Sequence, residues 1–333
     1  MTWFEVLTGF RETSPSQVRR NLTLNDETLT SNVNGNVMVC GRLETPSLAE
    51  LRERVQSGGR SGCNISVREV VANVQALHAD ASNAGSLFQV ASQFNLLEMV
   101  SPNVTPEQGV TCYENDPTQG PACAIAAGAG TIYRNYFACV NGQIGQSESN
   151  QIDCLADLGR ALGNSDNRRL WQMRNGYALA SASGLDEISN RLRTSSEDER
   201  DDLRKLLRIG IQWNTQVTLS GCTHKVTQAY CSALPIAYSA HSPHLWEDFA
   251  RLVLEASYEA TLCVAILNWR RTGNNRVFLT LLGGGAFGNK TNWIIEGINR
   301  VLRLYQDWNI EVSIVSFRVS KAYVRQLTEQ FLR

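Results

Sequence analysis

The chain has 333 residues, of which 43% are hydrophobic, and its formal net charge is -1. That is enough apolar material for one large α/β domain with additions or for two modest domains, so global disorder is excluded as a description. The near-neutral charge gives no reason to expect a nucleic-acid partner. The N-terminus lacks a basic region followed by a long apolar core, and no stretch resembles a membrane span. We therefore expect an intracellular, cytoplasmic protein with no membrane partner, and its oligomeric state stays open.

The nine cysteines are spread along the chain without a repeated CxxC motif. This pattern favours neither a disulfide scaffold nor a zinc ribbon. The nearest approach to a metal cluster is Cys222, His224 and Cys231, which has no matching second pair of ligands. We predict buried, reduced thiols and no metal site.

Residues 1–85 are polar and show helical spacing of apolar residues, as in 47–55 and 66–77. We predict a mainly helical N-terminal extension that packs on the rest of the chain. Residues 85–94, "GSLFQVASQF", form the first convincing buried strand. The main domain is accordingly predicted to span 86–333.

The sequence of the main domain then predicts both helices and strands. The sequence predicts a helix beginning at Pro121, a strand over 176–181, a capped helix within 195–212, two strands within 215–239, a long helix over 242–273, a strand over 277–282, a helix over 291–306, a strand over 310–317 and a last helix over 319–332. The late strand-helix-strand-helix alternation is typical of a parallel sheet covered by helices. The predicted fold class is therefore α/β.

A glycine-rich motif, "LTLLGGGAFGNKTNW" at 279–293, joins a predicted strand to a predicted helix. Backbone amides and a helix N-terminus at such a junction form a concavity suited to phosphate. Glycines allow close approach of a ligand and positive φ angles. The motif lacks the Lys-Ser/Thr end of a P-loop and the downstream acidic residue of a dinucleotide fold. A phosphate site and a plain tight turn, with Asn289 or Thr291 capping the helix, both fit it.

A second segment, residues 91–130, is long, irregular and rich in carboxylates and amides, as expected of a stretch that lines a site. Glu98 lies between Leu97 and Met99, so it is either a functional carboxylate near the core or an exposed turn residue. Asp116, which precedes Pro117, fits a functional carboxylate and the start of a turn equally well. Glu107 fits a functional carboxylate and a first-turn residue of a short helix equally well. Two helix-start loops and a carboxylate-bearing loop suit a ligand with a diphosphate and a sugar whose glycosidic bond is attacked.

The stretches "FQVASQFN", "QGPACAIAAGAG" and "LLGGGAFGNKTNW", in this order, resemble those of macrodomains, in the branch near poly(ADP-ribose) glycohydrolase. The resemblance is strongest to the MavL-type ADP-ribosylhydrolases, some of them bacterial effectors, which remove ADP-ribose from arginine. It spans roughly residues 86–318. It implies a macrodomain-like mixed sheet flanked by helices, ADP-ribose as substrate or product ligand, no required cofactor and an ADP-ribosylated protein as partner, with ubiquitin named by the resemblance alone.

The resemblance also implies roles for individual residues. The late loop would hold the diphosphate, with Phe287 against the distal ribose, and the early loop would supply the acidic groups. The implied catalytic residues are Glu98, Glu107 and Asp116, and the implied ligand-binding residues are Gln93, Asn95, Tyr113, Gln119, Gly120, Gly283, Gly284, Gly285, Ala286, Phe287, Gly288 and Asn289. The paired glutamates that follow a glycine triplet in the glycohydrolases are absent here. This departure favours removal of single ADP-ribose groups over cleavage of chains.

Two alternatives stand beside this hypothesis. The same pocket would serve a reader module that binds ADP-ribose and releases it unchanged, because ribose hydroxyls also need acceptors. A thiol hydrolase is the second alternative, since Cys123 follows the start of a predicted helix, with Gln119 as a possible oxyanion donor and His224, His241 or His244 as base.

Overall fold

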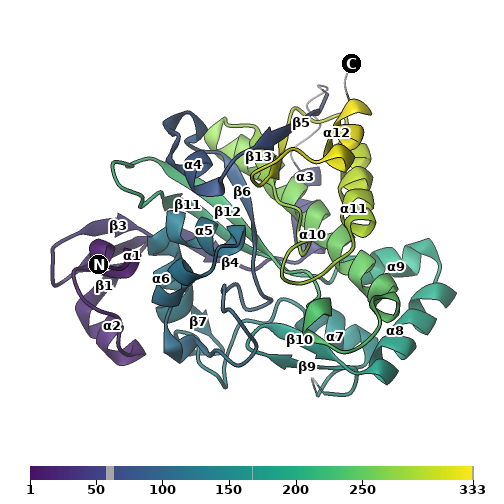
Figure 1. Ribbon diagram of the computed structural model, residues 1–333, viewed down its shortest axis with the longest axis horizontal. Coiled ribbons are helices and arrows are strands. Elements are labelled where there is room, and N and C mark those ends of the chain that lie inside the picture. Colours follow the sequence, from purple (N-terminus) through teal and green to yellow (C-terminus); the bar gives the residue numbers. More distant parts are fainter. Residues whose placement is uncertain (58–63, 167, 332–333) are drawn as a thin grey trace.

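The computed structural model describes residues 1–57, 64–166 and 168–331. Its centre is a seven-stranded sheet with the strand order β4-β11-β12-β6-β13-β14-β5 (Figure 1). In chain order these strands are β4 (Arg42–Glu44), β5 (Ser66–Val71), β6 (Leu87–Ala91), β11 (Gly210–Gln216), β12 (Lys225–Cys231), β13 (Arg276–Leu279) and β14 (Glu311–Ser316).

The sheet is mixed. The five strands from β12 to β5 run parallel to their neighbours, whereas β11 is antiparallel to both β12 and β4. The central strands read as short apolar runs that are buried along nearly their whole length, as expected where helices cover both faces of a sheet. The predicted fold class, a mixed α/β sheet flanked by helices, is confirmed.

Helices cover the two faces of the sheet. From β12 through β13 to β14, the chain passes along the sheet in one direction, with α10 and α11 as the connecting helices. From β5 to β6 it passes in the opposite direction, with α4 in the connection. Because such crossovers are right-handed, α10 and α11 lie on one face of the sheet and α4 lies on the other. The helix α5 packs on α4 and β6, and α6 packs on β11. The bounds are α4 (Val74–Ala79), α5 (Gln119–Ala126), α6 (Gly128–Tyr136), α10 (Pro243–Thr272) and α11 (Thr291–Leu304).

The long helix α10 is the centre of the larger hydrophobic core. It begins after the cap residue Ser242 with Pro243 at its first position, and it ends at Gly273, which has a φ of 77°. It packs against α11, against β12, β6 and β13, and against α3 (Leu48–Gln56), α8 (Ala182–Thr194) and α9 (Glu197–Arg204). The predicted helix over 242–273 is confirmed. Of the described residues, no helix is both long and apolar enough to cross a bilayer.

The N-terminal region departs from the prediction at two places. Residues 66–77 are not one helix, because β5 occupies Ser66–Val71 and α4 begins at Val74. The spacing of the β-branched residues Val67 and Val70 fits the buried face of a helix and a strand equally well. They form a strand because β14 pairs with this segment. Strands β4 and β5 are the two edges of the central sheet, so the sheet is built from residues on both sides of position 85.

The other N-terminal elements pack on α5 and α6 through a second buried cluster that includes Phe4, Val18, Leu29, Leu97 and Tyr113. These elements are α1 (Trp3–Thr8), α2 (Pro15–Asn21), β1 (Leu22–Asn25), β2 (Thr28–Ser31) and β3 (Val37–Val39). The remaining elements are β7 (Cys139–Val140), β8 (Gln143–Ile144), α7 (Ala156–Leu162), β9 (Trp171–Arg174), β10 (Tyr177–Ala180) and α12 (Ala322–Glu329). Position 332 of the last predicted helix lies outside the described residues.

Candidate active site

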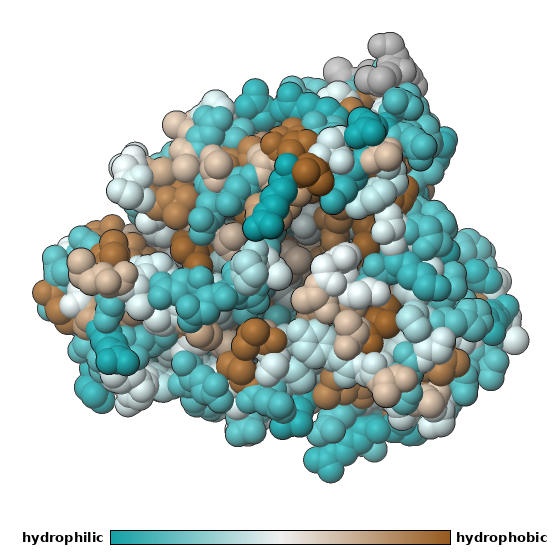
Figure 2. Space-filling view, viewed as in Figure 1, coloured by the Kyte–Doolittle hydropathy of each residue, from teal (hydrophilic) through white to brown (hydrophobic). Residues whose placement is uncertain are grey.

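A cavity of about 470 Å³ lies where the parallel strands end. All five parallel strands deliver residues to it at or just beyond their carboxyl ends, namely Val74 after β5, Ala91 from β6, Ala233 after β12, Thr280 after β13 and Val315 from β14. On the face shown in Figure 2 the surface is hollowed near its centre, with hydrophobic patches beside the hollow. This edge of an open α/β sheet is where such folds bind ligands.

The glycine-rich loop after β13 forms one wall of the cavity, from Gly283 to Phe287. Gly283 has a φ of 73°, and a Cβ there would lie 2.4 Å from the Cβ of Ala233. The amide of Asn289 donates to the carbonyl of Gly283 at 2.9 Å, which closes the loop. No backbone hydrogen bond among the described residues uses the amides of Gly285, Ala286 or Phe287, so these donors are available to an anion.

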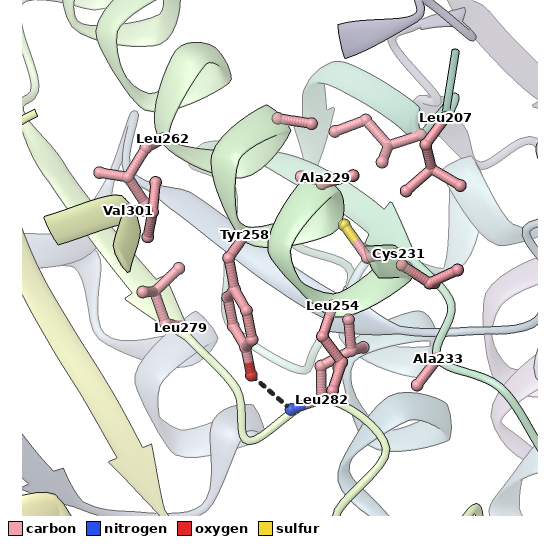
Figure 3. Close-up of a cluster of buried hydrophobic side chains, with 14 of the residues drawn as sticks. Leu207, Ala229, Cys231, Ala233, Leu254, Tyr258, Leu262, Leu279, Leu282 and Val301 are labelled. Atoms are coloured by element: carbon pink, nitrogen blue, oxygen red, sulfur yellow. Dashed lines mark hydrogen bonds between the residues drawn. The ribbon is translucent and has the colours of Figure 1, made fainter. Parts of the chain in front are cut away.

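The core fixes the start of this loop through Tyr258 of α10. Figure 3 shows the Tyr258 ring among buried aliphatic side chains, with its hydroxyl directed at the backbone of Leu282. That hydroxyl accepts a hydrogen bond from the Leu282 amide and donates one to the Thr280 carbonyl, both at 2.9 Å. The loop therefore leaves the sheet from a rigid anchor.

The turn after β6 forms a second wall and carries Glu98. The side chain of Gln93 makes two hydrogen bonds to the backbone of Met99, accepting from its amide at 2.8 Å and donating to its carbonyl at 3.1 Å. Asn95 accepts from the amide of Leu97, and the hydroxyl of Tyr113 accepts from the amide of Glu98 at 2.9 Å. This short polar turn is thus held in one conformation inside apolar surroundings.

The Glu98 carboxyl is buried and lines the cavity; the residue is only 3% exposed. Its Oε1 atom has no hydrogen-bond partner among the described residues. Its Oε2 atom lies 3.1 Å from the point that a Cβ on Gly120 would occupy, at the beginning of α5. Burial raises the pKa of Glu98 well above its usual value, the guanidinium of Arg134 opposes that shift, and the carboxylate of Asp116 adds to it.

Asp116, Gln119 and Gly120 reach the same cavity from the turn that precedes α5 and from its first residues. Asp116 accepts from the amide of Thr118 at 2.8 Å, which shapes the turn. Gln119 accepts from the amide of Val74 at 3.0 Å. A Cβ on Gly120 would lie 2.2 Å from the carbonyl oxygen of Ala91, so only glycine fits where α5 meets the end of β6.

The remaining residues named from the sequence lie outside the cavity lining. On the exposed surface, the amide of Glu148 donates a bifurcated hydrogen bond to the two carboxylate oxygens of Glu107. Asn95 and Tyr113 are buried and support the turn that carries Glu98. Asn289 is buried and donates to the carbonyl of Leu234, so it does not cap α11, whose cap residue is Lys290. Gly288 has a φ of 72° and shapes the turn into α11.

The cavity also has lining residues that the sequence did not single out. Tyr177 of β10 and Tyr238 form an aromatic cluster with Phe287, with ring centroids 5.0–5.7 Å apart. Phe317, Lys321 and Tyr323 line the wall beyond β14. Position at the carboxyl end of a parallel strand is the signal that marks Thr280 and Phe317 as candidates, whereas no local motif marks Tyr177 or Tyr238.

Cys123 does not suit a nucleophile. It is the fifth residue of α5, it is buried, and it is not part of the cavity lining. Burial raises the pKa of its thiol, which disfavours the reactive thiolate. Within the described part of the chain, no group of three or more His, Cys, Asp or Glu side chains is arranged to hold a metal ion.

Comparison with known proteins finds structural likeness only. No family model matches the sequence, and no curated protein matches it. The fold is similar to poly(ADP-ribose) glycohydrolase from Deinococcus radiodurans in complex with ADP-ribose, at 11% identity and a TM-score of 0.46 over 97% of this chain and 100% of that one. It is also similar to the enzyme from Thermomonospora curvata bound to the inhibitor ADP-HPD, at 12% identity and a TM-score of 0.46 over 96% of this chain and 97% of that one.

Proposed function

We propose that this protein is a hydrolase that removes ADP-ribose from modified protein side chains, with the N-glycosidic linkage to arginine as its substrate. One observation carries the proposal: a buried carboxyl, that of Glu98, lines the same cavity as a glycine-rich loop with free backbone amides. The first group suits proton transfer at a sugar, and the second suits a diphosphate.

The cavity offers a place for each part of the ligand. Amides of Gly285, Ala286 and Phe287 would donate to the diphosphate oxygens, as backbone amides at helix-start loops do. The aromatic cluster of Tyr177, Tyr238 and Phe287 offers a surface for the distal ribose ring. These placements would bring the proximal ribose, whose anomeric carbon reacts, next to Glu98.

In this mechanism a water molecule attacks the anomeric carbon of the proximal ribose and the bond from that carbon to the guanidine nitrogen breaks. Glu98 accepts the proton that water loses and passes a proton to the departing guanidine nitrogen, which leaves the carboxylate ready for another cycle. Burial raises the pKa of Glu98, which makes it a stronger proton acceptor than an exposed carboxylate. Asp116, in the same cavity, would stabilise positive charge on the departing group. Glu107, on the surface away from the cavity, has no part in this mechanism.

The decisive experiment mixes the purified protein with an ADP-ribosyl-arginine peptide and measures free ADP-ribose by chromatography. The proposal expects free ADP-ribose to accumulate with the parent protein and not with Glu98→Gln. Tight ADP-ribose binding without release of product would instead support a reader module. Poly(ADP-ribose) chains and a serine-linked peptide, run in parallel, test the preference for arginine-linked single groups.

A further inference from the structure

A buried cation lies behind the candidate active site. Arg134 of α6 is 0% exposed, and no carboxylate of the described residues lies within ion-pair distance of it. Its Nη1 atom has no hydrogen-bond partner in the part of the chain that the structure describes. A buried charge without a direct counterion is costly, so its retention calls for a physical reason.

The contacts of Arg134 lead to the turn that carries Glu98. Its Nε atom donates to the carbonyl of Leu96 at 3.0 Å, and its Nη2 atom donates to the hydroxyl of Thr131 at 3.0 Å. Its guanidinium carbon lies 3.6 Å from the centre of the Tyr230 ring. Leu96 has a φ of 65°, a left-handed conformation that is rare for a leucine. Arg134 therefore holds a strained residue two positions before Glu98.

Several titratable groups act on the Glu98 carboxyl or are acted on by it. They are Arg134 from α6, Asp116 from the turn before α5, Tyr113 from the 3-10 turn Thr111–Asn115, Cys123 from α5, Tyr177 from β10 and Tyr230 from β12. Arg134 is the one cation in this set. Its positive charge favours the ionised carboxylate, whereas burial and Asp116 favour the neutral acid.

We propose that Arg134 is a positioning residue that holds the Leu96 turn and places a buried positive charge behind the Glu98 carboxyl. The role of Glu98 in hydrolysis rests on the proposed function, but its ionisation is measurable without any substrate. A structural role alone would not make the charge of residue 134 matter.

The test follows the carboxyl carbon of Glu98 by NMR as a function of pH, with the signal assigned by its loss in Glu98→Gln. Removing a nearby opposite charge makes a carboxyl harder to ionise, so Arg134→Met is expected to move the titration midpoint upward by about one pH unit or more. Arg134→Lys keeps a positive charge, and its midpoint should stay close to that of the parent. Thr131→Val removes one hydrogen bond of Arg134 and keeps the charge, so it serves as the matched control with an unchanged midpoint.

The outcomes separate this inference from the proposed function. A midpoint that shifts in Arg134→Met and not in Arg134→Lys supports the inference even if no hydrolysis is detected. Equal midpoints in Arg134→Met and the parent, or equal shifts in the Met and Lys variants, overturn it. If Arg134→Met does not fold, Arg134→Gln takes its place, because glutamine has no charge but can still donate to the Leu96 carbonyl. A raised midpoint in Arg134→Gln supports the inference, and a midpoint equal to that of the parent overturns it.

Discussion

The backbone amide of Glu98 donates to the phenol oxygen of Tyr113 at 2.9 Å, inside the protein. This hydrogen bond ties the turn after β6 to the segment that leads into α5. The two segments that form one side of the cavity are thereby joined at the residue whose carboxyl lines it.

Tyr113→Phe should therefore weaken both stability and turnover. The substitution leaves a buried amide without its acceptor, which costs about 1–3 kcal/mol of unfolding free energy. Urea unfolding measures this loss, and product release from an ADP-ribosyl-arginine peptide measures turnover. Tyr133→Phe on α6 is the control, because the Tyr133 hydroxyl makes no hydrogen bond to the described residues. Equal stability of the two phenylalanine variants would argue against a supporting role for Tyr113.

Substitutions of the three carboxylates predicted to be catalytic should lower turnover by different amounts. Glu98→Gln should lower turnover by roughly 10²–10⁴-fold, as expected for loss of a general base, while ADP-ribose affinity by calorimetry changes little. Asp116→Asn should lower turnover by a smaller factor. Glu107→Gln should behave like the parent, because Glu107 contacts the amide of Glu148 and not the cavity. A Glu107 variant as impaired as the Glu98 variant would contradict this assignment.

The buried carboxyl of Glu98 should also make the unfolding free energy depend on pH. Burial raises the pKa of Glu98 above 4.5, so between the two values the folded protein binds more protons than the unfolded chain. This contribution to stability is therefore present at low pH and is lost as the pH rises through that window, by up to about 1.4 kcal/mol per pH unit. Glu98→Gln removes the effect. Its unfolding free energy relative to the parent should rise as the pH increases above 4.5, and a difference that does not change with pH would speak against a raised pKa for the buried carboxyl.

Substitutions in the glycine-rich loop should show which glycines leave space for the ligand and which are needed for stability. A Cβ on Gly285 meets nothing within 4 Å, whereas a Cβ on Gly284 would lie 3.0 Å from the Cδ1 of Ile294. Gly285→Val should thus weaken ADP-ribose binding at least tenfold with little loss of stability, because its side chain occupies space beside the free amides. Gly284→Val should lower the unfolding temperature. Calorimetry and thermal unfolding of both variants check this, and unaltered binding by Gly285→Val would place the diphosphate elsewhere.

The sequence predicts those parts of the fold that local patterns determine. The long helix predicted over 242–273 appears, with Pro243 at its first position and Gly273 at its end. The capped helix predicted within 195–212 appears as α9, with a capping box of Ser196 and Glu199. Residues 66–71 show where local pattern fails. Their β-branched residues form a strand because β14, more than two hundred residues later, offers a partner.

In the candidate site too, some residues can be predicted from local sequence and others depend on tertiary packing. Gln93, Glu98 and the glycine-rich loop stand in recognisable local contexts and do line the cavity. Tyr113 and Asn289 were predicted to contact ligand, but their side chains bind backbone groups of neighbouring segments, a choice that depends on tertiary packing. Tyr177 and Tyr238 come from segments without any motif, and only the folded sheet brings them together.

A crystal structure with bound ADP-ribose would locate the diphosphate and both riboses in one experiment. We expect diphosphate oxygens within hydrogen-bond distance of the amides of Gly285, Ala286 and Phe287, and the proximal ribose beside the carboxyl of Glu98. A cavity without nucleotide at saturating ADP-ribose, or a diphosphate bound away from this loop, would contradict this expectation.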